Sequence, residues 1–293
     1  MTHNVRKGTT LLKASYINDT RALANAMLSV RRCRYGTMMY LRQDIYVGRS
    51  FEEYGEYSEG EVDIFRQCLR PGDVALDIGA NFGSHTIPMA QFVGPAGAVH
   101  AFEPQRIPFQ ILCGNVALNE LGNVRALPQA VGAAAGKIKI PPLDYAGRNN
   151  FGGIPLGGAD GEDVEVITLD ALALPKLRLA KIDVEGMELD VLLGARATLA
   201  RCRPILYVEN DRVDKSETLA ARLLEDGYRL WWHTPPLYNA GNFLGNPQNV
   251  FGRIMSFNML CLPREAEMPV AGLREIKTPQ DAPDFLRGMA KAT

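Results

Sequence analysis

The chain has 293 residues, 46% of them hydrophobic, so it can bury a large core as one or two domains. Its 32 basic and 33 acidic residues give a net charge of -1, which argues against a dedicated nucleic-acid binder, since such proteins usually carry a basic excess. The five cysteines lie far apart and form no CxxC pair, and neither a secretory signal nor a membrane span is evident, so we expect a cytoplasmic protein with reduced thiols.

The first elements are short. Residues 37–47 predict two short strands around a turn at Gln43-Asp44. Ser58, with Glu61 three residues later, is a capping-box pattern, and a helix is expected to follow it until Pro71-Gly72.

From residue 74 onward, predicted strands and helices alternate. We expect strands at 74–78, 98–102, 124–130, 179–184, 205–208, 228–232 and 254–260. We expect helices at 84–92, from 109 to about 122, at 186–200 and at 217–226. The stretch 136–168 interrupts this rhythm and predicts an inserted hairpin with a mobile tip, whose loop 147–153 could be a lid or a plain surface loop. The alternation predicts an α/β fold, with a mostly parallel sheet covered by helices on both faces.

Three regions follow from this pattern. Residues 1–55 form an N-terminal extension, residues 56–262 form the α/β domain, and residues 263–293 form a loosely packed, Pro- and charge-rich tail. The two flanks could carry substrate choice or the contacts of a homo-oligomer.

The sequence DIGANFG, residues 77–83, follows an apolar strand and precedes a helix. Its glycines permit a sharp turn, and the helix start offers free N–H groups to an anionic ligand. The segment is not GxGxxG, because Asp77 stands where a dinucleotide site would have its first glycine. A carboxylate there suits an ammonium group, such as that of the methionine part of S-adenosylmethionine, better than a pyrophosphate. The alternative is a turn with a purely structural role.

Glu103-Pro104 ends the next predicted strand. A carboxylate at this position can accept both ribose hydroxyls of an adenosine, although NAD enzymes use the same device. Asp77 and Glu103 together favour S-adenosylmethionine, while each could also simply cap the helix that follows it. His85, beside the turn, could contact the carboxylate end of the cofactor or pack in the core.

A third group of polar residues follows two later strands. Asp183 and Glu185 could supply a general base for a hydroxyl acceptor, orient the methyl donor or merely begin a helix. Asp183, Glu209 and Asn210 are plausible oxygen ligands for Mg²⁺, or a polar rim that binds substrate directly. His233 is a reserve candidate for the base, or an ordinary rim histidine.

Several segments together resemble the FkbM family of methyltransferases. They are PGDVALDIGANFGSHT (71–86), GAVHAFEP (97–104), NVALNELGN (115–123), TLD (168–170), KIDVEGME (181–188) and Gly194-Ala195. The resemblance runs from about residue 55 to 211, and more weakly to 261. It implies a class I methyltransferase fold, which is Rossmann-like with a mostly parallel seven-stranded sheet, and usually O-methylation of a natural product or a saccharide.

The resemblance also implies roles for individual residues. Carried over by position, Asp77, Gly79, Asn81, Gly83 and Glu103 bind the cofactor, Gln129 and Ala130 lie near the adenine, and Asp183 and Glu185 face the reaction centre.

The resulting hypothesis is an S-adenosylmethionine-dependent O-methyltransferase, with Mg²⁺ as an optional second cofactor. The acceptor oxygen would attack the sulfonium methyl in line, and the enzyme would mainly position the two substrates. The alternatives are an NAD(P)-dependent oxidoreductase and a non-catalytic adenosylmethionine-binding protein. A small-molecule or saccharide acceptor is the expected partner.

Overall fold

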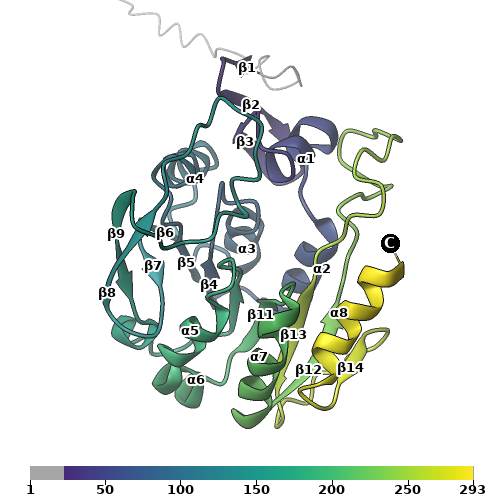
Figure 1. Ribbon diagram of the computed structural model, residues 1–293. Helices are drawn as coiled ribbons and strands as arrows, with labels where there is room; N and C mark the ends of the chain where they lie inside the picture. Colours follow the sequence, from purple (N-terminus) through teal and green to yellow (C-terminus); the bar gives the residue numbers. More distant parts are fainter. Residues whose placement is uncertain (1–22, 293) are drawn as a thin grey trace, which may run out of the picture.

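The structure, a computed structural model, describes residues 23–292 and is built on a central eight-stranded sheet (Figure 1). From edge to edge its strands are β14 (Arg274–Ile276), β12 (Tyr228–His233), β13 (Asn258–Pro263), β11 (Ile205–Glu209), β10 (Leu179–Ile182), β4 (Val74–Ile78), β5 (Ala98–Phe102) and β6 (Val124–Leu127). The five strands from β6 to β11 are parallel, and β13 runs antiparallel to β11.

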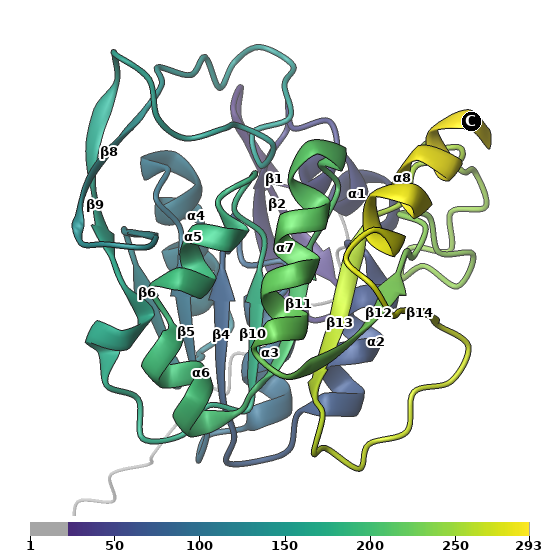
Figure 2. The same cartoon turned by 60° about the horizontal axis from the view of Figure 1, so that its bottom comes forward.

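Helices cover both faces of this sheet. One face carries α2 (Glu59–Cys68), α3 (Thr86–Val93) and α4 (Arg106–Leu118). The other carries α5 (Glu188–Leu193), α6 (Arg196–Cys202), α7 (Val213–Glu225) and α8 (Asp281–Ala292), of which α5 to α7 stand in front of the sheet in Figure 2. Successive residues of β4 point to opposite faces of the sheet. Leu76 and Ile78 pack in the hydrophobic core on the α5–α8 side, and Ala75 packs in the core on the α2–α3 side. The predicted fold class, a mostly parallel Rossmann-like sheet between two helical layers, is confirmed.

The C-terminal region is more ordered than its composition indicated. β14 adds an eighth strand beside β12, and α8 packs on α7. Ile276, Ala282 and Leu286 are buried in the large core, and the ring of Phe285 stacks on Trp232 with centroids 4.8 Å apart. The prediction of a loosely packed tail is therefore wrong, because its few apolar residues are spaced to cover the exposed flank of β12.

Two predicted elements are divided. The helix expected at 186–200 is interrupted at Gly194-Ala195, where Gly194 packs against the backbone of Gly132. The strand expected at 124–130 ends at Leu127, and Ala130–Val131 forms β7 in a separate small sheet.

The inserted hairpin is confirmed. β8 (Gly136–Ile140) and β9 (Glu162–Ile167) pair antiparallel, and β9 also pairs with β7. The chain continues through a short 3-10 turn, Leu169–Leu172, into β10.

An N-terminal layer packs over α3 and α4. It contains β1 (Leu23–Ala24), β2 (Leu28–Cys33), β3 (Gly36–Leu41) and α1 (Val47–Tyr54). The hairpin turn is at Arg34-Tyr35. The chain also turns at 42–43, close to the predicted position, but α1 follows this turn, so the second strand predicted there is wrong. The Asp44 carboxylate instead accepts the N–H groups of Tyr46 and Gly48 at the entry to α1.

The predicted capping box is also wrong. Ser58 is in the left-handed conformation with φ 45° and makes no side-chain bond to the helix backbone. Its hydroxyl donates to the Glu61 carboxylate at 2.7 Å. The pattern therefore orients an acidic side chain and does not cap the backbone.

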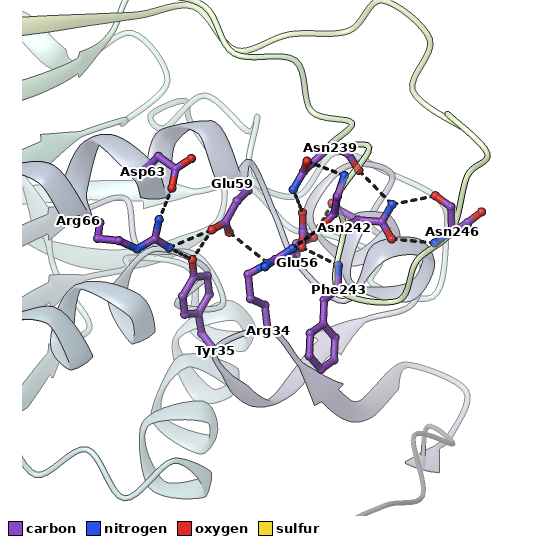
Figure 3. A network of polar contacts seen from close by, with 12 residues as sticks. Arg34, Tyr35, Glu56, Glu59, Asp63, Arg66, Asn239, Asn242, Phe243 and Asn246 are labelled. Carbon is purple, nitrogen blue, oxygen red and sulfur yellow. Dashed lines mark hydrogen bonds and ion pairs between the residues drawn. The ribbon is translucent and has the colours of Figure 1, made fainter.

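A long connection between β12 and β13, residues 234–257, returns over the N-terminal layer; we call it the β12–β13 loop. Figure 3 shows its anchor, the buried Glu56 carboxylate. Glu56 accepts hydrogen bonds from Arg34 Nε at 2.6 Å, from Asn239 Nδ2 at 2.8 Å and from the Phe243 N–H at 2.8 Å.

Within the described residues no helix is both long and apolar enough to cross a membrane.

Candidate active site

A cavity of about 450 Å³ opens at the carboxyl ends of β4, β5, β10 and β11. Ligands of open α/β sheets bind at this edge, and the volume lies within the range of about 300–1,000 Å³ for ligand pockets. The N-terminal layer adds Tyr46, Val47 and Tyr57 to the wall. The β12–β13 loop adds Leu237 and residues 254–257, and β13 adds Asn258. Asn150, Gly152 and Gly153 also line the cavity, so the loop 147–153 belongs to the site.

The predicted site residues divide into two groups. Those that line the cavity are Gly79, Asn81, His85, Glu103, Asp183, Glu185 and Glu209. Those that do not line it are Asp77, Gly83, Pro104, Gln129, Ala130, Asn210 and His233.

Glu103 is fixed in the cavity wall by the backbone. One carboxylate oxygen accepts the N–H of Asn81 at 2.7 Å, and the other accepts the N–H of Gln105 at 2.8 Å. Burial raises the pKa of Glu103 to about 7, although these two N–H groups act in the opposite direction. The carboxylate is thus held rigidly where it can accept further hydrogen bonds from a ligand in the cavity.

Pro104, Gln129 and Ala130 line a second, small and mainly apolar depression that borders Gly79. Leu156 from the inserted hairpin and Met187 also line it. A flat apolar group attached to a ribose at Glu103 would reach this depression.

Asp77 lies beneath the cavity and is fully buried. Thr86 Oγ1 donates to one of its oxygens at 2.6 Å, and Lys181 Nζ lies 3.3 Å from the other. Lys181 is itself buried, donates to the Gly79 carbonyl at 2.8 Å and lies 3.2 Å from Asp183 Oδ2. Asp77 and Lys181 are directly paired in the parallel register of β4 and β10, so a single lysine joins the glycine turn to Asp183.

A glycine is required at position 79 because the ends of β4 and β10 approach each other closely there. Its φ is +82°, and a Cβ atom there would lie 1.8 Å from the Asp183 carbonyl oxygen. Only glycine has both the backbone conformation and the space that this turn needs.

Three carboxylates gather beyond the turn. Asp183, Glu185 and Glu209 each offer one oxygen, and these three atoms lie within 4.8 Å of one another. Burial, and then the charges of Asp183 and Asp211, raise the pKa of Glu185 to about 8, against the effect of its ion pair with Arg212 Nη2 at 2.6 Å. Burial and the charges of Asp183 and Glu185 also raise the pKa of Glu209 well above its usual value.

Two predicted residues face away from the cavity. Asn210 is buried and its amide contacts Met259 Sδ at 3.2 Å. His233 Nδ1 is hydrogen-bonded to the Tyr207 hydroxyl at 2.7 Å, and the residue lines a separate depression with Trp232 and Arg274.

Comparisons with known proteins identify the family of this chain. A family model described as the Methyltransferase FkbM domain matches residues 77–230, more than half of the chain. The chain belongs to the FkbM methyltransferase family. It is an S-adenosylmethionine-dependent methyltransferase, as predicted, and the oxidoreductase alternative loses its support.

Individual relatives cover different shares of the chain. The 31-O-demethyl-FK506 methyltransferase FkbM of Streptomyces tacrolimicus is 28% identical over 76% of this chain and 94% of its own length. The hexuronic acid methyltransferase AglP of Haloferax volcanii is 29% identical over 54% of this chain and 66% of its own length. Among solved structures, a methyltransferase FkbM from Methylobacillus flagellatus superposes with a TM-score of 0.44 at 15% identity, covering 68% of this chain and 50% of its own.

Three site residues were not singled out from the sequence. The sequence could have indicated Lys181, because a lysine in the otherwise apolar strand Leu179–Ile182 needs a buried partner for its charge. Glu188 accepts the N–H groups of Val184 and Gly186 and so holds the loop that carries Glu185. Glu61 was assigned to a capping box, and its place in the cavity wall depends on the tertiary structure.

Proposed function

We propose that the protein transfers the methyl group of S-adenosylmethionine to a hydroxyl oxygen of a small-molecule natural product or a saccharide. The relatives' names support this acceptor class, because one acts on an O-demethyl-FK506 and another on a hexuronic acid. The observation that carries the proposal is the group of carboxylates, Asp183, Glu185 and Glu209, in the same cavity as the glycine turn and Glu103.

The residues present fit the cofactor. Glu103 would accept the ribose hydroxyls, and the depression at Pro104, Gln129 and Ala130 would hold the adenine. When bound, S-adenosylmethionine supplies an electrophilic methyl group. The turn at Gly79 and Asn81 would hold the cofactor while the acceptor enters from the side of the β12–β13 loop.

We assign the general base to Asp183. Its side chain is 35% exposed, compared with 16% for Glu185, and Lys181 orients it through one oxygen. The other oxygen can accept the proton of the acceptor hydroxyl as that oxygen attacks. Glu185 is already engaged by Arg212, and the hydrogen-bonded His233 lies outside this cavity, so both are second to Asp183.

The same cluster offers a second candidate role, a divalent cation site. Asp183, Glu185 and Glu209 would be its ligands, in place of the predicted set with Asn210, because the Asn210 amide turns into the core. Glu209 Oε2 is buried and finds no hydrogen-bond partner in the described part of the chain. Carboxylate oxygens are the ligands that Mg²⁺ prefers, and a bound cation would lower the pKa of the acceptor hydroxyl.

The charge of the cavity restricts the acceptor. Six carboxylates line it, and its two described cations, Lys181 and Arg212, are both paired with carboxylates. The carboxylates are Glu61, Glu103, Asp183, Glu185, Glu209 and Asp211. An acidic acceptor would find no unpaired cation among the described lining residues to offset its charge, so we propose a neutral or cationic acceptor.

The five cysteines are all unpaired, which supports a cytoplasmic location. We propose that two segments select the acceptor, because they build the cavity wall beyond the glycine turn. They are the N-terminal layer and the β12–β13 loop.

The test is formation of S-adenosylhomocysteine from S-adenosylmethionine with a panel of neutral sugars, amino sugars, hexuronic acids and polyketide alcohols. We expect turnover with neutral or amino acceptors. Asp183→Asn should lower kcat by about 10²–10⁴-fold, whereas Asp214→Asn, an exposed change on α7, should not. Loss of turnover in EDTA and its return with Mg²⁺ would show that the carboxylate cluster works as a cation site. Full activity of Asp183→Asn would exclude Asp183 as the base.

A further inference from the structure

Two acceptors of the glycine turn that could bind the ammonium group of the cofactor are already contacted by a lysine. They are the Asp77 carboxylate and the Gly79 carbonyl, whereas the Asn81 amide oxygen has no hydrogen-bond partner among the described residues. Lys181 Nζ contacts both, at 3.3 and 2.8 Å, and Thr86 takes the other Asp77 oxygen. Asp77 is completely buried and does not reach the cavity. The lysine thus already occupies the place that the sequence pattern assigned to the ligand.

Another carboxylate faces the cavity beside the turn. Glu61, on α2, is only 4% exposed and lines the cavity together with Ser84 and His85 at the start of α3. The Ser58 hydroxyl holds one of its oxygens at 2.7 Å. Burial raises the pKa of Glu61, since the charged form has lost most of its water. A cation that entered the cavity here would compensate that loss.

His85 provides the second observation. Its Nε2 is buried and has no hydrogen-bond partner among the described residues, and His85 lines the same cavity as Glu61. Glu61 Oε2 is 3.8 Å away, too far for a hydrogen bond. Burial and the charge of Lys181 lower the pKa of His85 well below its usual value, so the ring is neutral. The rings of Tyr57 and Phe65 pack against it at centroid distances of 5.7 and 5.3 Å and fix its position.

An acidic oxygen and an unpartnered ring nitrogen, side by side, match a ligand that carries an ammonium and a carboxylate on one carbon. We propose that Glu61 accepts the ammonium group of the methionine part of S-adenosylmethionine, and that His85 donates from Nε2 to its α-carboxylate. This inference rests on the proposed use of that cofactor in this cavity. Asp77 then acts on the cofactor only through Lys181, and α2, which precedes the family-matched residues 77–230, becomes part of the cofactor site.

The test compares three ligands by isothermal titration: S-adenosylmethionine, S-adenosylhomocysteine, and 5′-methylthioadenosine, which lacks the amino-acid part. Glu61→Gln should weaken binding of the first two by roughly ten- to a hundredfold, while 5′-methylthioadenosine changes less than about twofold. Glu61→Asp, which keeps the charge, should recover part of the lost affinity. Asp63→Asn, on the same helix but half exposed and paired with Arg66, is the matched control and should bind all three ligands as the wild type does.

The methylthioadenosine arm also reports folding, because a variant that binds it normally has an intact adenosine site. Equal affinity of wild type and Glu61→Gln for S-adenosylmethionine would overturn the inference, and so would a parallel loss of all three ligands. Failure of the wild-type protein to bind either S-adenosylmethionine or S-adenosylhomocysteine would instead overturn the proposed cofactor site itself.

Discussion

Glu103 shows how one side chain can be prepared for a ligand by its backbone neighbours. The N–H groups of Asn81 and Gln105 hold its two oxygens, and Asn81 can do so because it adopts a left-handed conformation with φ 49°. Burial still raises its pKa to about 7. The residue therefore changes charge within the range in which the enzyme can be assayed.

This titration predicts a pH dependence of cofactor binding. The raised pKa leaves Glu103 mostly protonated at pH 6 and mostly ionised at pH 8. In the proposed site the ionised form would accept both ribose hydroxyls, so the affinity for the cofactor should rise with pH. We expect the Kd for S-adenosylhomocysteine to fall by about tenfold from pH 6 to pH 8. In Glu103→Gln the affinity should be low and independent of pH over this range. A wild-type Kd that does not change between these pH values would contradict the assignment.

Gly79 gives a prediction about stability at the same scale. In Gly79→Ala the new Cβ would collide with the Asp183 carbonyl oxygen in a left-handed backbone, so we expect a loss of roughly 3–5 kcal/mol in urea unfolding. Gly94→Ala is the matched control, since Gly94 also has a positive φ of +62° but nothing lies within 4 Å of a Cβ there. The control should cost only about 1–2 kcal/mol. Equal losses in the two variants would show that the close approach at Gly79 does not matter.

At the scale of elements, a few polar contacts hold the β12–β13 loop in place, since the loop contains no helix or strand. Its stretch from 239 to 246 is tied to the N-terminal layer by Glu56, and Asn246 Nδ2 donates to the Glu53 carbonyl at 3.2 Å. The Tyr54 hydroxyl further accepts the Val250 N–H and donates to the Gln248 carbonyl, both at 2.8 Å. The same loop then supplies residues 254–257 to the cavity wall.

Release of Glu56 should therefore loosen this wall. Glu56→Gln removes the charge that Arg34 and the two loop donors share, and we expect about 1.5–3 kcal/mol of destabilisation. Amide hydrogen exchange in residues 239–250 should become faster, while exchange in β4 and β10 stays slow. Glu225→Gln, an exposed change on α7, serves as the control. Unchanged exchange in the loop would mean that other contacts hold it.

At the scale of the whole molecule, the C-terminal segment completes the core on the flank of the antiparallel strands. β14 pairs with β12, so the edge of β12 is not exposed, and Ile276 and Leu286 enter the same core as Leu76 and Leu192. Five parallel strands and their helices thus carry the proposed cofactor site, while the C-terminal segment stabilises the far edge of the sheet.

Removal of residues 264–293 should consequently weaken the entire fold. The lost burial of Ile276 and Leu286 alone corresponds to about 3–6 kcal/mol, and the freed edge of β12 should promote self-association. Thermal unfolding and light scattering of the truncated protein test this. A truncated protein that unfolds at the wild-type temperature and stays monomeric would show that the segment is dispensable for the core.

The sequence by itself determined the α/β architecture, the positions of β4, β5, β10 and β11, and the carboxylates at their ends. These follow from local signals, since apolar runs of strand length end in glycine turns or acidic residues, and parallel strands bring their carboxyl ends to one edge. For the same reason Glu103, Asp183, Glu185 and Glu209 were found, and the structure places all four in one cavity.

Only the tertiary structure decided which polar groups are free for a ligand. Asp77 and Lys181 are 104 residues apart, yet they are neighbours in register between β4 and β10, and their pairing removes Asp77 from the cavity. Glu61 and Glu56 likewise gain their roles from loops and helices that meet far from one another in sequence. A local pattern shows that a side chain can ionise; its partners, set by packing, determine whether that charge is used inside the fold or offered to a ligand.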